Sequence, residues 1–172
     1  MTFFIGIKVN LDNFCKIVKE PFSPEPLDRH HITLVYLGKR KLPTELRTEL
    51  KNIPVRTFSI ILKGGIAIPS LFKPRVLAAK VSNGKQHLIN LREIVLSTLI
   101  KHDQKVEDRF LEDFLPHATF ARYKGKDYIF ASKVAKEILK RAENTIQKVI
   151  VSELCLYEAK EQLEIIDVFK LL

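Results

Sequence analysis

The stretch that decides the fold is His31-Ile32-Thr33-Leu34-Val35-Tyr36-Leu37-Gly38, and its first four positions have a counterpart in the second half of the chain, His117-Ala118-Thr119-Phe120. In a β-strand, successive side chains point to opposite faces. The histidine and the threonine of each copy therefore share one face, and the two apolar residues take the other. Each copy predicts a strand that is anchored in a core and presents an imidazole and a hydroxyl on its other side.

Strands and helices are predicted around both copies of this motif. The hydrophobic patterns predict strands over 3–9, 31–37, 56–68, 75–82, 117–123, 147–158 and 163–171, and helices over 12–20, 44–52, 85–101 and 128–142. We expect Asp12 to cap the first helix and Gly64-Gly65 to break or bulge the third strand. The segment 102–114 is predicted to be a loop.

The two halves of the chain, approximately 1–70 and 71–172, follow the same order of strand, helix, strand, helix, strand. Long loops and half-polar strands favour antiparallel sheets over a parallel one. We therefore predict an α+β fold with two pseudo-symmetric lobes, each an antiparallel sheet backed by helices, and with a cleft between them. The lobes would form one bilobal domain over 1–172 and could exchange strands.

A pseudo-two-fold axis between the lobes would bring the two polar pairs face to face. Two imidazoles could then act as acid and base near neutral pH, since the ordinary histidine pKa is about 6.5. The threonine hydroxyls could donate to phosphate oxygens, so the set fits phosphodiester chemistry without a metal or another cofactor. One His-x-Thr pattern is usually strand filler, but two copies at matching places are much harder to dismiss. Zinc binding is the alternative for the imidazoles, although neither motif contains a carboxylate or a cysteine.

The composition fits an intracellular protein with a polyanionic partner. The chain has 172 residues, 46% of them hydrophobic, and no apolar run long enough to cross a bilayer. Its formal net charge of +9 favours nucleic acid, although a basic surface also serves solubility. Cys15 and Cys155 lie in apolar patterns and are predicted to be buried thiols. We expect a cytoplasmic monomer with no membrane partner.

Other histidines and tyrosines are predicted to have structural places. His30 falls on the opposite face from His31, so we expect it at the start of the strand or on the surface. His87 and His102 are expected to face solvent. Tyr36 and Tyr123 could stack on a base, but strand tyrosines are more often in the core.

The two motifs resemble those of the two-histidine (2H) phosphoesterase superfamily, and within it the RNA 2′,3′-cyclic phosphodiesterases, historically called 2′-5′ RNA ligases. The carrying residues are 31–38, 115–122 and the connecting Lys63-Gly64-Gly65-Ile66-Ala67-Ile68-Pro69. The resemblance implies hydrolysis of an RNA terminal 2′,3′-cyclic phosphate to a 2′-phosphomonoester without metal, with tRNA fragments among the possible substrates.

The resemblance also implies roles for residues. His31 would be the proton donor and His117 the acceptor, with Thr33 and Thr119 at the phosphate. Arg122 matches an arginine that can approach the phosphate, but strand parity places it away from Thr119. Either a bulge redirects Arg122 or its role is structural.

Three functions remain open from the sequence. The first is the cyclic phosphodiesterase, and the second is a 2′-5′ RNA ligase or 2′,5′-phosphodiesterase that uses the same residues. The third is a non-catalytic RNA-binding module, which would have no need of a paired acid and base. The chain has no tryptophan, and Ile68 stands where many relatives have phenylalanine, so the preference for a base stays open.

Overall fold

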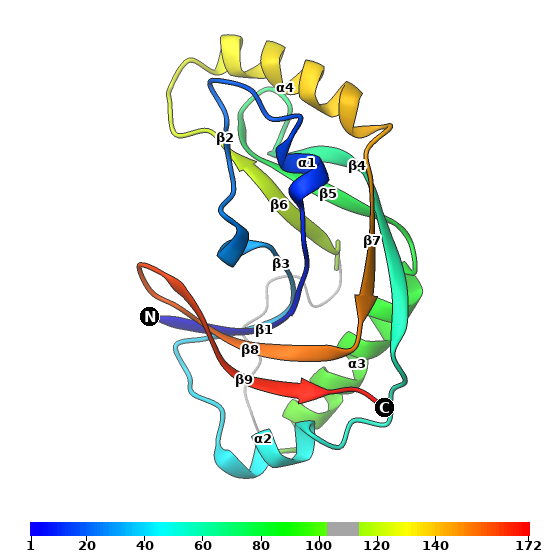
Figure 1. Cartoon of the computed structure of the whole chain (residues 1–172). Helices are drawn as coiled ribbons and strands as arrows, with labels where there is room; N and C mark the ends of the chain where they lie inside the picture. The colour runs from blue at the N-terminus through cyan, green and yellow to red at the C-terminus, as the bar shows by residue number, and fades with distance from the viewer. Residues whose placement is uncertain (103–113) are drawn as a thin grey trace.

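Two antiparallel sheets with helices packed against them make up the computed structural model, which describes residues 1–102 and 114–172 (Figure 1). The strands are β1 (Thr2–Lys8), β2 (Ser23–Pro24), β3 (His31–Gly38), β4 (Phe58–Pro69), β5 (Pro74–Asn83), β6 (His117–Arg122), β7 (Ile146–Val151), β8 (Glu153–Ala159) and β9 (Leu163–Lys170). The helices are α1 (Asp12–Cys15), the 3-10 turn η1 (Leu27–Arg29), α2 (Thr44–Leu50), α3 (Lys85–Lys101) and α4 (Tyr128–Ala142). The predicted α+β class is confirmed.

The two sheets do not coincide with the two halves of the sequence. The first sheet has the order β3-β1-β8-β9, and the second has the order β2-β6-β5-β4-β7. Strands from the C-terminal end of the chain thus complete the sheet that begins with β1 and β3. The helix α4 packs on β4 and β5, and α3 packs on β3 and α2. The strands β3 and β6, which carry the two motifs, contact each other where the sheets meet.

The predicted strand over 147–158 is wrong, because the chain changes sheets at Ser152. Val151, the last residue of β7, pairs with Phe58 in the second sheet, whereas Glu153 pairs with Lys170 in the first. No glycine or proline marks this change, and the hydrophobic pattern runs through it. Only the hydrogen-bonding partners divide the segment into two strands.

The predicted helix over 12–20 is also too long, and Asp12 does not cap it. The helix α1 covers Asp12–Cys15, follows Leu11 and has no side-chain cap, although the Asn10 side chain accepts from the Asp12 N–H at 2.8 Å. Beyond it, the N–H groups of Ile17 and Val18 bond to carbonyls three residues back, at 3.2 Å each. These tighter turns replace the α-helical pattern.

The sequence did not predict β2 or η1, but the other described elements follow the prediction closely. The helices α3 and α4 have the predicted bounds, and β9 pairs with β8 in a hairpin. Lys63 and Gly64 together oppose Lys80, which is the predicted bulge, and Gly64 has a φ of 77° that suits glycine. The predicted loop over 102–114 lies, apart from its ends, outside the described residues.

Both cysteines are free, as predicted, with Cys155 buried and Cys15 half-buried. No helix within 1–102 or 114–172 is long and apolar enough to cross a membrane.

Candidate active site

The two motif strands alternate as the sequence predicts. Four residues of the motifs are buried in the core: Ile32, Leu34, Ala118 and Phe120. The other four are partly exposed: His31, Thr33, His117 and Thr119. The apolar residues therefore hold each strand in place, while the imidazoles and hydroxyls stay accessible to a ligand.

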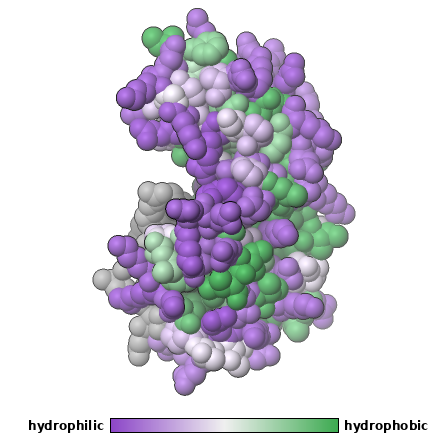
Figure 2. All heavy atoms as spheres, turned by 60° about the vertical axis from the view of Figure 1, so that its left-hand side comes forward, coloured by the Kyte–Doolittle hydropathy of each residue, from purple (hydrophilic) through white to green (hydrophobic). Residues whose placement is uncertain are grey.

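The fold brings the two imidazoles into one neighbourhood. β3 and β6 are in contact, and the charge of His117 acts on His31. Figure 2 shows the surface indented between two lobes, with hydrophilic side chains gathered around the indentation. An anionic ligand between the lobes could meet both motifs.

Each imidazole is oriented by the same kind of hydrogen bond. The Nδ1 of His31 lies 2.8 Å from the carbonyl oxygen of Arg29, and the Nδ1 of His117 lies 2.8 Å from that of Leu115. A carbonyl only accepts, so Nδ1 carries the hydrogen in both rings. The Nε2 atom of each ring is then the one that can exchange a proton with a substrate.

His31 rests on a pair of stacked aromatic rings from the first sheet. The ring centroids of Phe4 and Tyr157 are 4.8 Å apart, and those of Phe4 and His31 are 4.9 Å apart. The Tyr157 ring lies 5.6 Å from the His31 ring. These rings exclude water from one side of the imidazole.

This burial decides the charge of His31. Desolvation lowers the pKa of His31 to about 4, against the opposing effect of the Arg29 carbonyl. The positive charges of Arg29, His117 and Arg122 act in the same direction as desolvation and contribute to this lowered pKa. His31 is therefore neutral at pH 7 in the unliganded protein.

A bulge in β6 places Arg122 on the face of the imidazoles. Thr119 pairs with Ala78 and Ala121 pairs with Leu77, so Phe120 is an extra residue in its strand. Beyond the bulge, Arg122 pairs with Val76, which lies on the same face of β5 as Ala78. Strict alternation of side chains along β6 predicts that Arg122 faces away from Thr119. This prediction is wrong, because the bulge at Phe120 shifts the alternation by one residue.

The motif strand β3 has a bulge at the equivalent position. Thr33 pairs with Gly6 and Val35 with Ile5, which makes Leu34 the extra residue. Tyr36 then pairs with Phe4, on the same face as Thr33. Tyr36 is 38% exposed, so the prediction that it is a core residue is wrong.

Tyr123 fits the core prediction better than Tyr36 does. Its half-buried ring packs against the core and contacts Phe22 at 5.6 Å and Tyr128 at 5.9 Å between centroids.

His30 is buried and structural, not a surface residue. Its Nδ1 accepts from the Leu11 N–H at 3.1 Å, so its Nε2 donates to the carbonyl of Glu25 at 2.7 Å. His102 is half-buried and hydrogen-bonds through Nε2 to the carboxylate of Glu49, which contradicts its predicted exposure. His87 is exposed, as predicted, and its ring stacks on Phe58.

The sequence prediction missed Glu25, whose carboxylate pairs with Arg122 at 2.7 Å. Glu25 stands between two prolines with no motif around it, and only the pairing of β2 with β6 brings it to this place.

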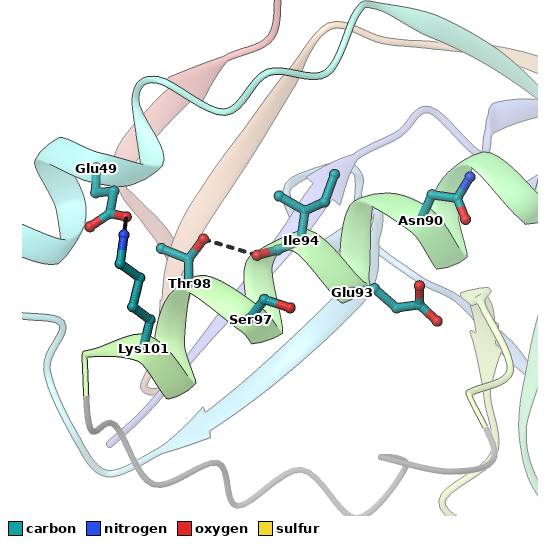
Figure 3. Close-up of a pocket in the computed structure, with 7 residues that line it drawn as sticks. All are labelled: Glu49, Asn90, Glu93, Ile94, Ser97, Thr98 and Lys101. Atoms are coloured by element: carbon teal, nitrogen blue, oxygen red, sulfur yellow. Dashed lines mark hydrogen bonds and ion pairs between the residues drawn. The ribbon is translucent and has the colours of Figure 1, made fainter.

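A polar groove elsewhere on the surface has no part of either motif. It lies along α3, facing α2, and Figure 3 shows its lining: Glu49, Asn90, Glu93, Ile94, Ser97, Thr98 and Lys101. Its described lining contains no histidine, so the groove does not offer the acid–base pair that the two motifs offer.

A fold with two antiparallel sheets and a His-x-Thr motif on each of two contacting strands defines the class of a two-histidine phosphoesterase. Residues 19–162 match the family model described as the 2′-5′ RNA ligase superfamily, and the chain belongs to this superfamily.

One curated relative and several solved structures are similar to the chain. The RNA 2′,3′-cyclic phosphodiesterase of Aeropyrum pernix is 33% identical over 100 residues, which cover 57% of this chain and 55% of that protein. The match thus spans about half the length of the relative. The crystal structure of TT0787 of Thermus thermophilus superposes with a TM-score of 0.71 at 18% identity, over 99% of this chain and 97% of that one. E. coli LigT complexed with 3′-AMP gives a TM-score of 0.63 at 18% identity, with the same coverage.

Proposed function

We propose that this protein hydrolyses the terminal 2′,3′-cyclic phosphate of RNA to a 2′-phosphomonoester, with His31 and His117 as the acid–base pair. The observation that carries this proposal is the matched orientation of the two imidazoles. Each Nδ1 is fixed by a backbone carbonyl two residues upstream, and the rings stand on contacting strands. Family membership and the similarity to a phosphodiesterase relative support the choice of reaction.

The step follows from these two rings. The oxygen of a water molecule attacks phosphorus while one Nε2 takes its proton, and the other Nε2 gives a proton to the ribose O3′ as the P–O3′ bond breaks. Thr33, Thr119 and Arg122 lie on the face of the imidazoles, where they can donate to the non-bridging oxygens. The pair supplies acid and base itself, so the scheme uses no cofactor.

The lowered pKa of His31 favours it as the acceptor, which leaves His117 as the donor. This is the reverse of the roles that the family resemblance implies. A bound phosphate anion favours a charged imidazole and raises the pKa of His31, so the pH profile of the active enzyme tests these roles.

The physiological partner that we propose is RNA with a cyclic phosphate end, tRNA fragments included. The net charge of +9 attracts such a polyanion. We place the protein in the cytoplasm, since its free cysteines suit a reducing compartment. We also propose that it acts as a monomer.

The test is incubation with an oligonucleotide that ends in a 2′,3′-cyclic phosphate, followed by identification of the product end. A 2′-phosphomonoester is expected. Joining to a 5′-hydroxyl strand, or cleavage of an internal 2′,5′ linkage alone, would instead assign the ligase or 2′,5′-phosphodiesterase. Binding without turnover would leave only an RNA-binding module.

A further inference from the structure

Glu25 is a buried carboxylate held between two arginines beside the candidate active site. Its side chain is 4% exposed, with Oε2 2.7 Å from Nε of Arg122 and Oε1 3.5 Å from Nε of Arg29. A buried carboxylate is costly unless it is paired and hydrogen-bonded. The two guanidinium groups therefore fix the place of this carboxylate.

The backbone around Glu25 is also hydrogen-bonded to the motif strand β6. The strand β2 pairs with β6 immediately before it, with Ser23 opposite Arg122. The Glu25 N–H donates to the carbonyl of Phe120 at 2.9 Å, and its own carbonyl accepts from His30. The backbone of Glu25 is thus hydrogen-bonded to β6, the strand that carries Arg122.

Arg122, in contrast, has an exposed side chain that needs a partner to stay in one orientation. It is 44% exposed, and Glu25 accepts from its Nε. Within residues 1–102 and 114–172, the ion pair of this guanidinium is with Glu25, through Nε. A guanidinium is a rigid fork, so a partner on Nε orients the two terminal nitrogens as well.

We propose that Glu25 is a positioning residue: it holds Arg122 by Nε and keeps the terminal nitrogens available for the non-bridging oxygens of the cyclic phosphate. The inference rests on the proposed function, because it takes Arg122 as a phosphate ligand. In this role Glu25 acts through Arg122 and contacts neither the substrate phosphate nor the attacking water.

Two effects of removing Glu25 have opposite signs, which makes the inference testable. Loss of a negative charge next to the site would by itself strengthen anion binding. Loss of the fixed partner frees the Arg122 side chain, and ordering this side chain on binding then opposes phosphate binding. Positioning predicts weaker phosphate binding, whereas a role only in charge predicts equal or tighter binding.

The experiment measures the affinity of inorganic phosphate by calorimetry. Glu25→Ala is expected to bind phosphate about tenfold more weakly, the scale of one charge-assisted hydrogen bond. Glu25→Gln is expected to lose about threefold, because its amide oxygen can still accept from Nε. If Glu25→Ala does not fold, Glu25→Gln carries the test alone, and equal or tighter binding in the folded variant overturns the inference.

A matched control and a double variant separate positioning from general damage. Asp167 on β9 pairs with Nε of Arg47 on α2 at 2.9 Å, in the same way as Glu25 pairs with Arg122. Asp167→Asn removes this carboxylate and should leave the affinity for phosphate unchanged. If Glu25 acts through Arg122, adding Glu25→Gln to Arg122→Met should cost nothing further. Additive losses would overturn the inference. Phosphate binding needs no turnover, so absence of cyclic phosphate hydrolysis would count against the proposed function and not against this one.

Discussion

His31 and His117 begin equivalent strands, and each Nδ1 donates to the carbonyl two residues before it. Their surroundings differ, because Phe4 and Tyr157 pack against His31 from the first sheet. Within residues 1–102 and 114–172, no aromatic ring pairs with His117 in this way. One motif, placed in two sheets, thus gives one imidazole with an apolar wall and one without it, which is a route to different roles for the same side chain.

The bulges extend the comparison beyond the histidines. Both strands gain one residue after the motif threonine, and the residue five places after each histidine returns to the imidazole face. In β3 this residue is the tyrosine Tyr36, and in β6 it is Arg122. The pseudo-symmetric frame therefore offers an aromatic side chain from one strand and a cation from the other.

The largest expected effect comes from removing either imidazole. His31→Ala and His117→Ala should each lower kcat by about a hundredfold or more, the usual scale for a lost general acid or base. Thr33→Ala and Thr119→Ala should cost less, since a hydroxyl donates only one hydrogen bond. Initial rates on a cyclic phosphate oligonucleotide measure this, with circular dichroism as the folding control. Full activity in either histidine variant contradicts the acid–base assignment.

The next largest effects should come from Arg122 and Tyr36, the two residues beyond the bulges, and should differ in size. Arg122→Met should raise KM by about tenfold, because a charge-assisted bond to the phosphate is lost. Tyr36→Leu should have a smaller effect, about twofold to threefold, since it removes a neutral side chain and no charge. Michaelis kinetics on the same substrate compare them. A larger loss for Tyr36→Leu would mean that base contacts outweigh phosphate contacts.

The rings of Phe4 and Tyr157 against His31 should set the acidic limb of the pH profile of kcat/KM. With His31 as the base, kcat/KM should fall only as the pH approaches about 4, where His31 becomes protonated. Phe4→Ala lets water reach the ring, which raises the pKa of His31 and moves this limb toward 6.5. His31→Ala should abolish the limb, and His117→Ala should abolish the alkaline one. Loss of the alkaline limb in His31→Ala would give His31 the role of acid.

A smaller effect is expected on the pH dependence of stability. The folded-state pKa of His31 lies below its unfolded value, so the unfolded chain binds more protons between pH 6.5 and 4. Its contribution to the free energy of unfolding is present above pH 6.5 and is lost as the pH falls toward 4. Urea unfolding at pH 7 and pH 4.5 should show a smaller loss in His31→Gln than in the wild type. An equal loss would mean that other groups govern acid unfolding.

Chelation should leave activity unchanged, since the proposed step takes its acid and base from imidazoles. Assays with and without EDTA check this. A loss that zinc or manganese restores would instead support a metal-dependent reaction.

The sequence by itself determined the faces of the two motifs. His-Ile-Thr-Leu and His-Ala-Thr-Phe alternate with period 2, and burial of the apolar pairs leaves no other arrangement in a half-exposed strand. It also determined α3 and α4, each of which has a long apolar stripe, and in α4 the Asp127 side chain caps the first turn. Local signals suffice for such elements.

Only the tertiary structure decided where Arg122, Tyr36 and Glu25 lie. The bulges at Leu34 and Phe120 involve ordinary apolar residues, so nothing in the sequence marks the shift of alternation that follows them. The change of sheet at Ser152 and the approach of Glu25 to β6 depend on which strands pair across long sequence distances. Hydrogen bonds between distant strands set these features, and a pattern read along one chain does not contain its partners.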